Sequence, residues 1–139
     1  FKQYVDKSFY NGTLFHRTVN NFMIQGGGFT TGLKSKPGDA PIKNEAAVGI
    51  SNKRGTISMA RTDDPNSATS QFFINVLDNP HLDASASNYG YAVFGKVVDG
   101  MDVADQISIV PTKNSGGFAN TPVQEILINS VAKTSCPAA

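Results

Sequence analysis

Hydrophobic and polar residues alternate in several short runs along the chain, and this pattern predicts β-strands. Each run is rich in β-branched and aromatic residues and is bounded by Gly, Pro, Asn or Asp. The expected strands are residues 14–19, 22–25, 56–60, 71–76, 91–97 and 123–131. Because no long helical segments alternate with these strands, the pattern indicates a mainly β fold, a barrel or a sandwich rather than a parallel sheet.

Two segments show helical spacing instead. At the start of the chain, apolar residues fall on one helical face: Phe1, Tyr4, Val5 and Phe9. No capping residue precedes Phe1, so we expect the chain to open inside a helix, with upstream residues missing from it. The second segment is DGMDVADQIS, for which Asp99 or Asp102 is the expected N-cap. Residues 30–52 and 61–70 have turn composition, and loops of that length often carry function.

Composition sets the size of the domain and excludes several partners. With 139 residues, 40% of them hydrophobic, we expect one domain over residues 1–139 that ends in a tail at 132–139. The net charge is +1 and no run of like charges occurs, so neither nucleic acid nor a membrane surface is an expected partner. The single cysteine, Cys136, lies in the tail, where we expect a free thiol without an internal disulfide.

The stretch FHRTVNNFMIQGGG, residues 15–28, carries the first candidate chemistry. Its Asn-Asn pair suits a tight turn between two strands. Neighbours in a strand point to opposite faces, so His16 and Arg17 cannot serve the same surface, and we expect His16 to be structural. By the same rule Met23 and Gln25 share a face. An arginine near apolar residues and a glutamine, with no carboxylate in the stretch, suits a neutral, partly apolar ligand that carries acceptors.

The glycines at the end of this stretch, Gly26 to Gly28, do not fit a phosphate-binding loop, because the GxxxxGK[ST] pattern is absent. We expect them to allow a close approach of backbone to another segment. A second stretch, SATSQFFINV, places Gln71 and Phe73 on one face of a strand. The chain has two histidines, no paired carboxylates, no His/Cys cluster and no GxSxG motif. An enzyme of this composition is therefore expected to use neither a metal nor a nucleophile.

Four blocks of the chain occur in an order and spacing typical of a known family: FYNGTLFHRTVNNFMIQGGGFT, PIKNEA, RGTISMARTDDPNSATSQFFINV and GYAVFGKVVDGMDVADQI. On these blocks the chain resembles a bacterial cyclophilin, a peptidyl-prolyl cis/trans isomerase, over residues 1–131. The resemblance implies a closed antiparallel eight-stranded barrel capped by two helices, with the proline site on its outer surface. The family has about two strands before the point where this chain begins, so the N-terminal strands are expected to be missing here.

The resemblance also assigns a site, position by position. Arg17 matches the catalytic arginine and Gln25 the glutamine that supports it. The proline pocket is matched by Phe22, Met23, Phe73 and Leu82, and the groove for the residues before proline by Ala60, Arg61 and Gln71. Two positions depart from the eukaryotic pattern, since His81 stands in place of a tryptophan and Tyr91 in place of a histidine. The lost indole predicts weakened binding of cyclosporin-type inhibitors, whereas turnover is expected to survive.

The function that the resemblance implies is accelerated rotation about X-Pro peptide bonds, which assists protein folding. The expected partners are proline-containing peptides and unfolded protein clients of a monomer that needs no cofactor. An alternative is a proline-peptide binding module or holdase without significant turnover, although a pure binder has no need of the arginine. A carbohydrate-binding β domain would be expected to expose tryptophans, and the chain has none. The tail AKTSCPAA and the residues of the central blocks favour a location of the protein in the bacterial periplasm over the cytoplasm.

Overall fold

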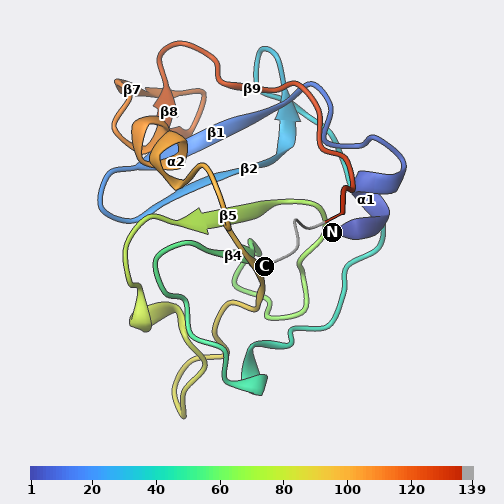
Figure 1. Ribbon diagram of the computed structural model, residues 1–139, viewed down its shortest axis with the longest axis vertical. Helices are drawn as coiled ribbons and strands as arrows, with labels where there is room; N and C mark the ends of the chain where they lie inside the picture. Colours follow the sequence, from blue (N-terminus) through green and yellow to red (C-terminus); the bar gives the residue numbers. More distant parts are fainter. Residues whose placement is uncertain (136–139) are drawn as a thin grey trace.

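In the computed structural model, which describes residues 1–135, a seven-stranded antiparallel sheet and a separate β-hairpin are accompanied by two α-helices (Figure 1). The elements are α1 (Lys2–Asp6), β1 (Thr13–Val19), β2 (Met23–Thr30), β3 (Lys34–Ser35), η1 (Ala46–Val48), β4 (Thr56–Met59), β5 (Phe72–Asn75), η2 (Pro80–Leu82), β6 (Val93–Lys96), α2 (Met101–Ser108), β7 (Thr112–Ser115), β8 (Phe118–Pro122) and β9 (Leu127–Ile128). The predicted mainly β fold is confirmed. Cys136 lies outside the described residues.

Five of the six expected strands are present as β1, β2, β4, β5 and β6, but the sixth is much shorter than predicted. Of residues 123–131 only β9 is a strand, and it pairs with Thr13 and Leu14 at the start of β1. Val123 in this segment is exposed, and its backbone N–H donates to the carbonyl oxygen of Pro111, which lies just before β7. The pattern also missed the hairpin of β7 and β8, whose turn is formed by Gly116 and Gly117, both with positive φ.

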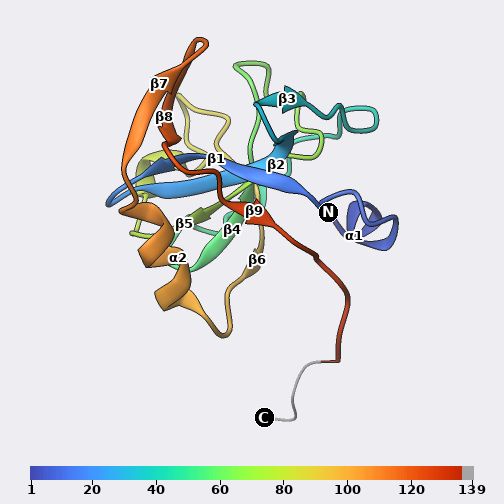
Figure 2. The same ribbon diagram turned by 90° about the horizontal axis from the view of Figure 1, so that it is seen from above.

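The large sheet is open rather than closed into the expected eight-stranded barrel. Its order is β6-β4-β5-β2-β1-β9, with β3 paired to β2, so β6 and β9 stand at its two ends. Closure would require pairing between these ends, and within residues 1–135 neither end strand has a second partner. Figure 2, a view from above, shows α2 on one side of the strands and α1 on the other.

A β-bulge in β1 decides which way its side chains point. Phe15 pairs with Gly26 and Arg17 with Gln25, so two steps along β1 correspond to one step along β2. The extra residue reverses the alternation of the strand, a common use of bulges beside functional sites. Phe15 therefore packs on the hydrophobic core, while Arg17 lies on the other face beside Gln25.

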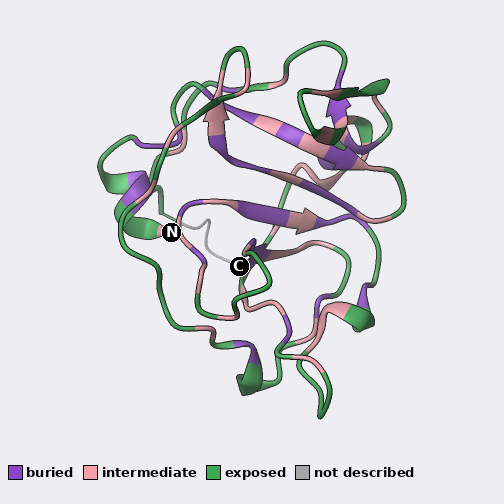
Figure 3. Cartoon of the chain, turned by 180° about the vertical axis from the view of Figure 1, so that it is seen from behind, coloured by how far each residue is buried: buried purple, intermediate pink, exposed green. Residues whose placement is uncertain are grey.

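The main core fills the space between α1 and the sheet. Its buried residues are Tyr4, Val5, Phe9, Tyr10, Phe72 and Ile128. Figure 3 shows the buried residues following the central strands, with the surrounding loops exposed. A second cluster, with Ile24, Val76 and Ala104, packs α2 against the sheet. The prediction that Asp99 or Asp102 caps α2 was wrong: Gly100 is the N-cap, in a left-handed conformation, and no side chain bonds to the helix end.

The three glycines of β2 allow close packing, as the sequence predicted. A Cβ at Gly26 would lie 2.6 Å from the carbonyl oxygen of Leu14, and one at Gly28 would lie 2.5 Å from the Gln71 side chain. Gly27 has a φ of +89°, and the Tyr10 ring lies where its Cβ would be. These positions bring β2 against its neighbours on both sides.

None of the helices in residues 1–135 is long and apolar enough to cross a membrane.

Candidate active site

A cavity of about 100 Å³ lies on the face of the sheet to which the bulge turns Arg17. It is lined by Arg17, Phe22, Met23, Gln25, Ala60, Arg61, Phe73, Leu82 and Tyr91. All nine residues belong to the site expected from the sequence. The other two expected residues, Gln71 and His81, contact members of this set without lining the cavity themselves.

Three neighbouring strands place the central residues of the cavity side by side. Gln25 on β2 pairs with Arg17 on β1 and with Phe73 on β5, so the three side chains share one face. Met23 shares that face because it lies two residues before Gln25. Met23, Ala60 and Phe73 form a buried apolar floor. The result is an apolar slot with one cationic side chain at its edge.

The apolar slot is completed by partly buried residues that pack on this floor. They are Val19, Phe22, Leu82 and Tyr91. Val19 was missed at the sequence level, although it lies two residues after Arg17 on the same face of β1, which is the signal that could have identified it.

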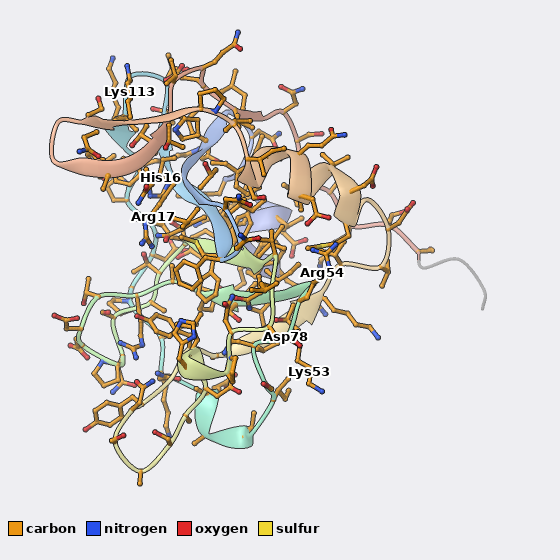
Figure 4. All side chains as sticks on the ribbon, turned by 90° about the vertical axis from the view of Figure 1, so that its left-hand side faces the viewer. His16, Arg17, Lys53, Arg54, Asp78 and Lys113 are labelled. Atoms are coloured by element: carbon orange, nitrogen blue, oxygen red, sulfur yellow. The ribbon has the colours of Figure 1, made fainter. Side chains whose placement is uncertain are left out.

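The Arg17 guanidinium is the charged group of the site. It is half-buried, and within the described residues it makes no hydrogen bond or ion pair. Among residues 1–135 no carboxylate lines the cavity. Figure 4 shows Arg17 and His16 on β1, next to the β7–β8 hairpin. The five N–H donors of Arg17 are thus free to bond to a ligand that carries acceptors.

Gln71 contributes to the site through Gln25. The Gln25 Nε2 donates to Gln71 Oε1 over 2.9 Å, and the Gln71 side chain lies against Gly28. The absence of a Cβ at Gly28 is what leaves room for the Gln71 side chain. Gln25 is thereby held beside Arg17, so the hydrogen bond gives the third glycine a role in the site.

Arg61 forms a wall of the cavity, and each of its three side-chain nitrogens already donates one hydrogen bond. Its Nε and Nη2 donate to the carbonyl oxygen of Gly90 at 3.2 and 2.9 Å, and its Nη1 donates to that of Thr62 at 2.8 Å. Its guanidinium also lies 4.3 Å from the centroid of the Tyr91 ring, which in turn meets the Phe73 ring edge-on. Arg61 therefore orients Tyr91. On its other side Arg61 lines a larger cavity of about 460 Å³ with Met59, Ala68 and Thr69.

The two histidines both lie outside the cavity. His81 is exposed at its rim, with its ring stacked on Phe22 at a centroid distance of 5.6 Å. His16 is 5% exposed and packs against Phe29 and Phe118. Burial, and to a smaller extent the charge of Arg17, lowers the pKa of His16 to about 4. His16 is therefore neutral at pH 7 and has the surroundings of a structural histidine. Across residues 1–135 no three His, Cys, Asp or Glu side chains come together as a metal site.

Comparison with known proteins identifies the family to which the chain belongs. The family model described as cyclophilin type peptidyl-prolyl cis-trans isomerase matches residues 1–133. The chain is 60% identical over 131 residues to a peptidyl-prolyl cis-trans isomerase of Acinetobacter baylyi, covering 94% of this chain and 70% of the relative. It is 53% identical over 134 residues to peptidyl-prolyl cis-trans isomerase B of Escherichia coli, covering 94% and 82%.

A solved structure has a similar overall fold. The crystal structure of a cyclophilin type peptidyl-prolyl cis-trans isomerase of Cryptosporidium parvum, determined in the presence of the dipeptide Ala-Pro, superposes with a TM-score of 0.79. The two chains are 29% identical, and the match covers 96% of this chain and 82% of that one.

Proposed function

Because the chain belongs to the family of cyclophilin-type peptidyl-prolyl cis-trans isomerases, we propose that the cavity beside Arg17 is where it turns X-Pro peptide bonds. Membership of this family makes the chain a peptidyl-prolyl cis-trans isomerase. The roles given below to individual residues are proposed. The observation that carries it is an unpartnered guanidinium at the edge of an apolar slot.

The slot suits the proline ring. Met23, Ala60 and Phe73 form its floor, and Phe22 and Leu82 pack around it. Together they would hold the ring still while the acyl side of the peptide bond rotates. The larger cavity beyond Arg61 lies next to this slot and would receive the residues before proline.

Arg17 would act at the transition state. The barrier to rotation is about 18–20 kcal/mol, because the nitrogen lone pair is delocalised into the carbonyl group. In the twisted state the lone pair is localised on nitrogen and can accept a hydrogen bond. A donor that bonds only to this state accelerates the reaction, since it stabilises the transition state more than the ground state. Arg17 stays protonated, and Gln25, held by Gln71, would orient it or a bound water. No proton is transferred, so the site requires no general base.

The lowering of the activation free energy can be divided between the apolar slot and Arg17. Uncatalysed isomerisation takes about 10–100 s. A gain on the order of 10⁵ requires about 7 kcal/mol, at about 1.4 kcal/mol per decade. One charge-assisted hydrogen bond in a partly dry site supplies about 3 kcal/mol. Ground-state positioning and desolvation in the slot would have to supply the remainder.

The test is NMR exchange spectroscopy on an Ala-Pro peptide with the wild type and Arg17→Ala. We expect the variant to lose about two to three decades of turnover while it stays folded. The matched control is Arg54→Ala, because Arg54 pairs with Asp105 on the surface and does not line the cavity (Figure 4). Unchanged turnover in Arg17→Ala would remove this residue from its role. Peptide binding without accelerated exchange in the wild type would favour the binding-module alternative.

Three further expectations stand as proposals. His81 in place of a tryptophan supports weak cyclosporin binding, and nanomolar inhibition would contradict it. The tail composition supports a periplasmic location, to be tested by cell fractionation. Within residues 1–135 the end strands β6 and β9 each have one partner, and this supports a closed barrel in a longer natural protein, since unpaired strand edges invite pairing with other chains. Cooperative unfolding of the 139-residue chain as a monomer would argue against the longer protein.

A further inference from the structure

Three asparagines behind the cavity are almost completely buried, and the reaction as described uses none of them. Asn52 and Asn75 are 0% exposed and Asn79 is 3% exposed. They come from separate segments: the loop before β4, the end of β5 and the residue before η2. A buried amide is costly unless it is hydrogen-bonded, so three together call for an account of their partners.

The three side chains form one hydrogen-bonded chain, which we call the asparagine network. Asn75 Nδ2 donates to Asn52 Oδ1 over 3.1 Å, and Asn79 Nδ2 donates to Asn75 Oδ1 over 2.8 Å. The backbone N–H of Asn79 also donates to the carbonyl oxygen of Asn52 over 2.8 Å. Links through both side chain and backbone fix the three segments relative to one another.

Both ends of the asparagine network hold the backbone of residues that line the proline cavity. At one end, Asn79 Nδ2 donates to the carbonyl oxygen of Phe22 over 2.9 Å. At the other end, Asn52 Nδ2 donates to the carbonyl oxygens of Leu82 and Tyr91 at 3.3 and 3.1 Å. Phe22 follows the turn between β1 and β2, whereas Leu82 and Tyr91 flank a loop far along the chain. The network thus connects two walls of the cavity that lie far apart in the sequence.

The Asn52 end is itself anchored. The Asp83 carboxylate accepts hydrogen bonds from the backbone N–H of Asn52 over 2.7 Å, from its Nδ2 over 3.0 Å and from the Ser51 hydroxyl. Leu82 and Tyr91 are joined directly as well, since the N–H of Tyr91 donates to the carbonyl oxygen of Leu82 over 2.8 Å. These bonds hold the two ends of the loop at residues 83–90 together. The backbone of Leu82 and Tyr91 is therefore tied to Asn52 and to itself by hydrogen bonds.

We propose that the asparagine network is a positioning device that sets the width of the proline cavity and thereby selects a five-membered ring. The inference rests on the proposed function, because it takes this cavity as the seat of the proline ring. In a cavity of about 100 Å³ a small outward movement of Phe22 admits an additional methylene group. Discrimination against one extra methylene in an apolar pocket is about 10–200-fold, so the distance between the walls has a measurable effect on specificity.

The experiment compares prolyl peptides with peptides that carry pipecolic acid, the six-membered homologue. Asn79→Ala removes the bond to Phe22, and Asn79→Ser is a milder second variant whose hydroxyl can donate one hydrogen bond in place of two. Thr13→Val is the matched control, because Thr13 is also 0% exposed and donates one buried bond, to the carbonyl oxygen of Tyr10, but does not line the cavity. kcat and KM are measured where circular dichroism shows each variant to be folded.

We expect the KM of Asn79→Ala for the prolyl peptide to rise about fivefold with kcat changed by less than about twofold, because ring binding is weakened in ground and transition states alike. The ratio of kcat/KM for the pipecolyl peptide to that for the prolyl peptide should rise about tenfold. Thr13→Val should change neither the KM for the prolyl peptide nor the ratio of the two kcat/KM values. A variant that is only destabilised would lower the apparent kcat with KM unchanged.

Two outcomes would overturn the inference. One is the wild-type KM and ring preference in a folded Asn79→Ala or, if that variant does not fold, in a folded Asn79→Ser, and the other is an equal change of ring preference in Thr13→Val. These failures are distinct from failure of the proposed function, which would be seen as full turnover in Arg17→Ala.

Discussion

The buried His16 should make the stability of the fold depend on pH between about 6.5 and 4. Its pKa is lowered from 6.5 to about 4, first by burial and second by the charge of Arg17. The unfolded chain therefore binds a proton between pH 6.5 and 4 that the folded protein does not bind. Stability is fully present above pH 6.5 and is lost as the pH falls towards 4.

The structure sets the size of this effect. A tenfold difference in proton affinity corresponds to about 1.4 kcal/mol, so the full loss is about 3 kcal/mol. Between pH 7.5 and pH 5 the same linkage relation gives about 2 kcal/mol. The pKa of Asp83 is also lowered, because the hydrogen bonds from Ser51 and Asn52 outweigh the effect of its burial, and that of Asp105 is lowered chiefly by its bond to Arg54. Both carboxyls start from 3.8, so their contributions are lost only below the range of this measurement.

The assay is urea unfolding followed by circular dichroism at pH 7.5 and pH 5. With a slope of about 2 kcal/mol per molar urea, the midpoint of the wild type should fall by about 1 M. His16→Phe, which keeps a ring between Phe29 and Phe118, should show a midpoint that hardly changes with pH. His81→Phe is the control, since His81 is exposed and its removal should leave the pH dependence intact. A pH dependence that persists in His16→Phe would refute the reasoning.

Three further predictions concern the cavity. Gln71→Ala removes the acceptor of Gln25, so kcat should fall about tenfold with little change in stability, as measured by NMR exchange; a wild-type rate would show that Gln25 needs no support. Gly28→Ala places a Cβ 2.5 Å from the Gln71 side chain and should cost about 1–3 kcal/mol and part of the activity, whereas Gly95→Ala, whose Cβ has no neighbour nearer than 3.9 Å, should keep both. His81→Trp restores an indole donor at the rim and should strengthen cyclosporin inhibition about tenfold, measured in the same exchange assay. Unchanged inhibition would show that this position does not affect inhibitor binding.

Local sequence patterns predicted five of the strands, β1, β2, β4, β5 and β6, and part of the site. Alternation in the stretch around Met23 and Gln25 placed both side chains on one face, and the structure shows both lining the cavity. The same rule placed Gln71 and Phe73 together, and the glycine run was correctly attributed to close packing. The resemblance to the cyclophilins named the nine residues that line the cavity.

Alternation between near neighbours was enough to predict β1, β2, β4, β5 and β6 and the side chains that share a face within a strand, because alternation is a local property. Contacts between distant segments settled the other features. The bulge that turns Arg17 outward depends on the register between β1 and β2. The short β9 and the open ends of the sheet depend on which strand edges find partners. The asparagine network joins residues 22, 52, 79 and 91 through hydrogen bonds that no local pattern encodes. Register, edge pairing and buried polar bonds are all properties of segments far apart in the chain, so they are settled only when the chain folds.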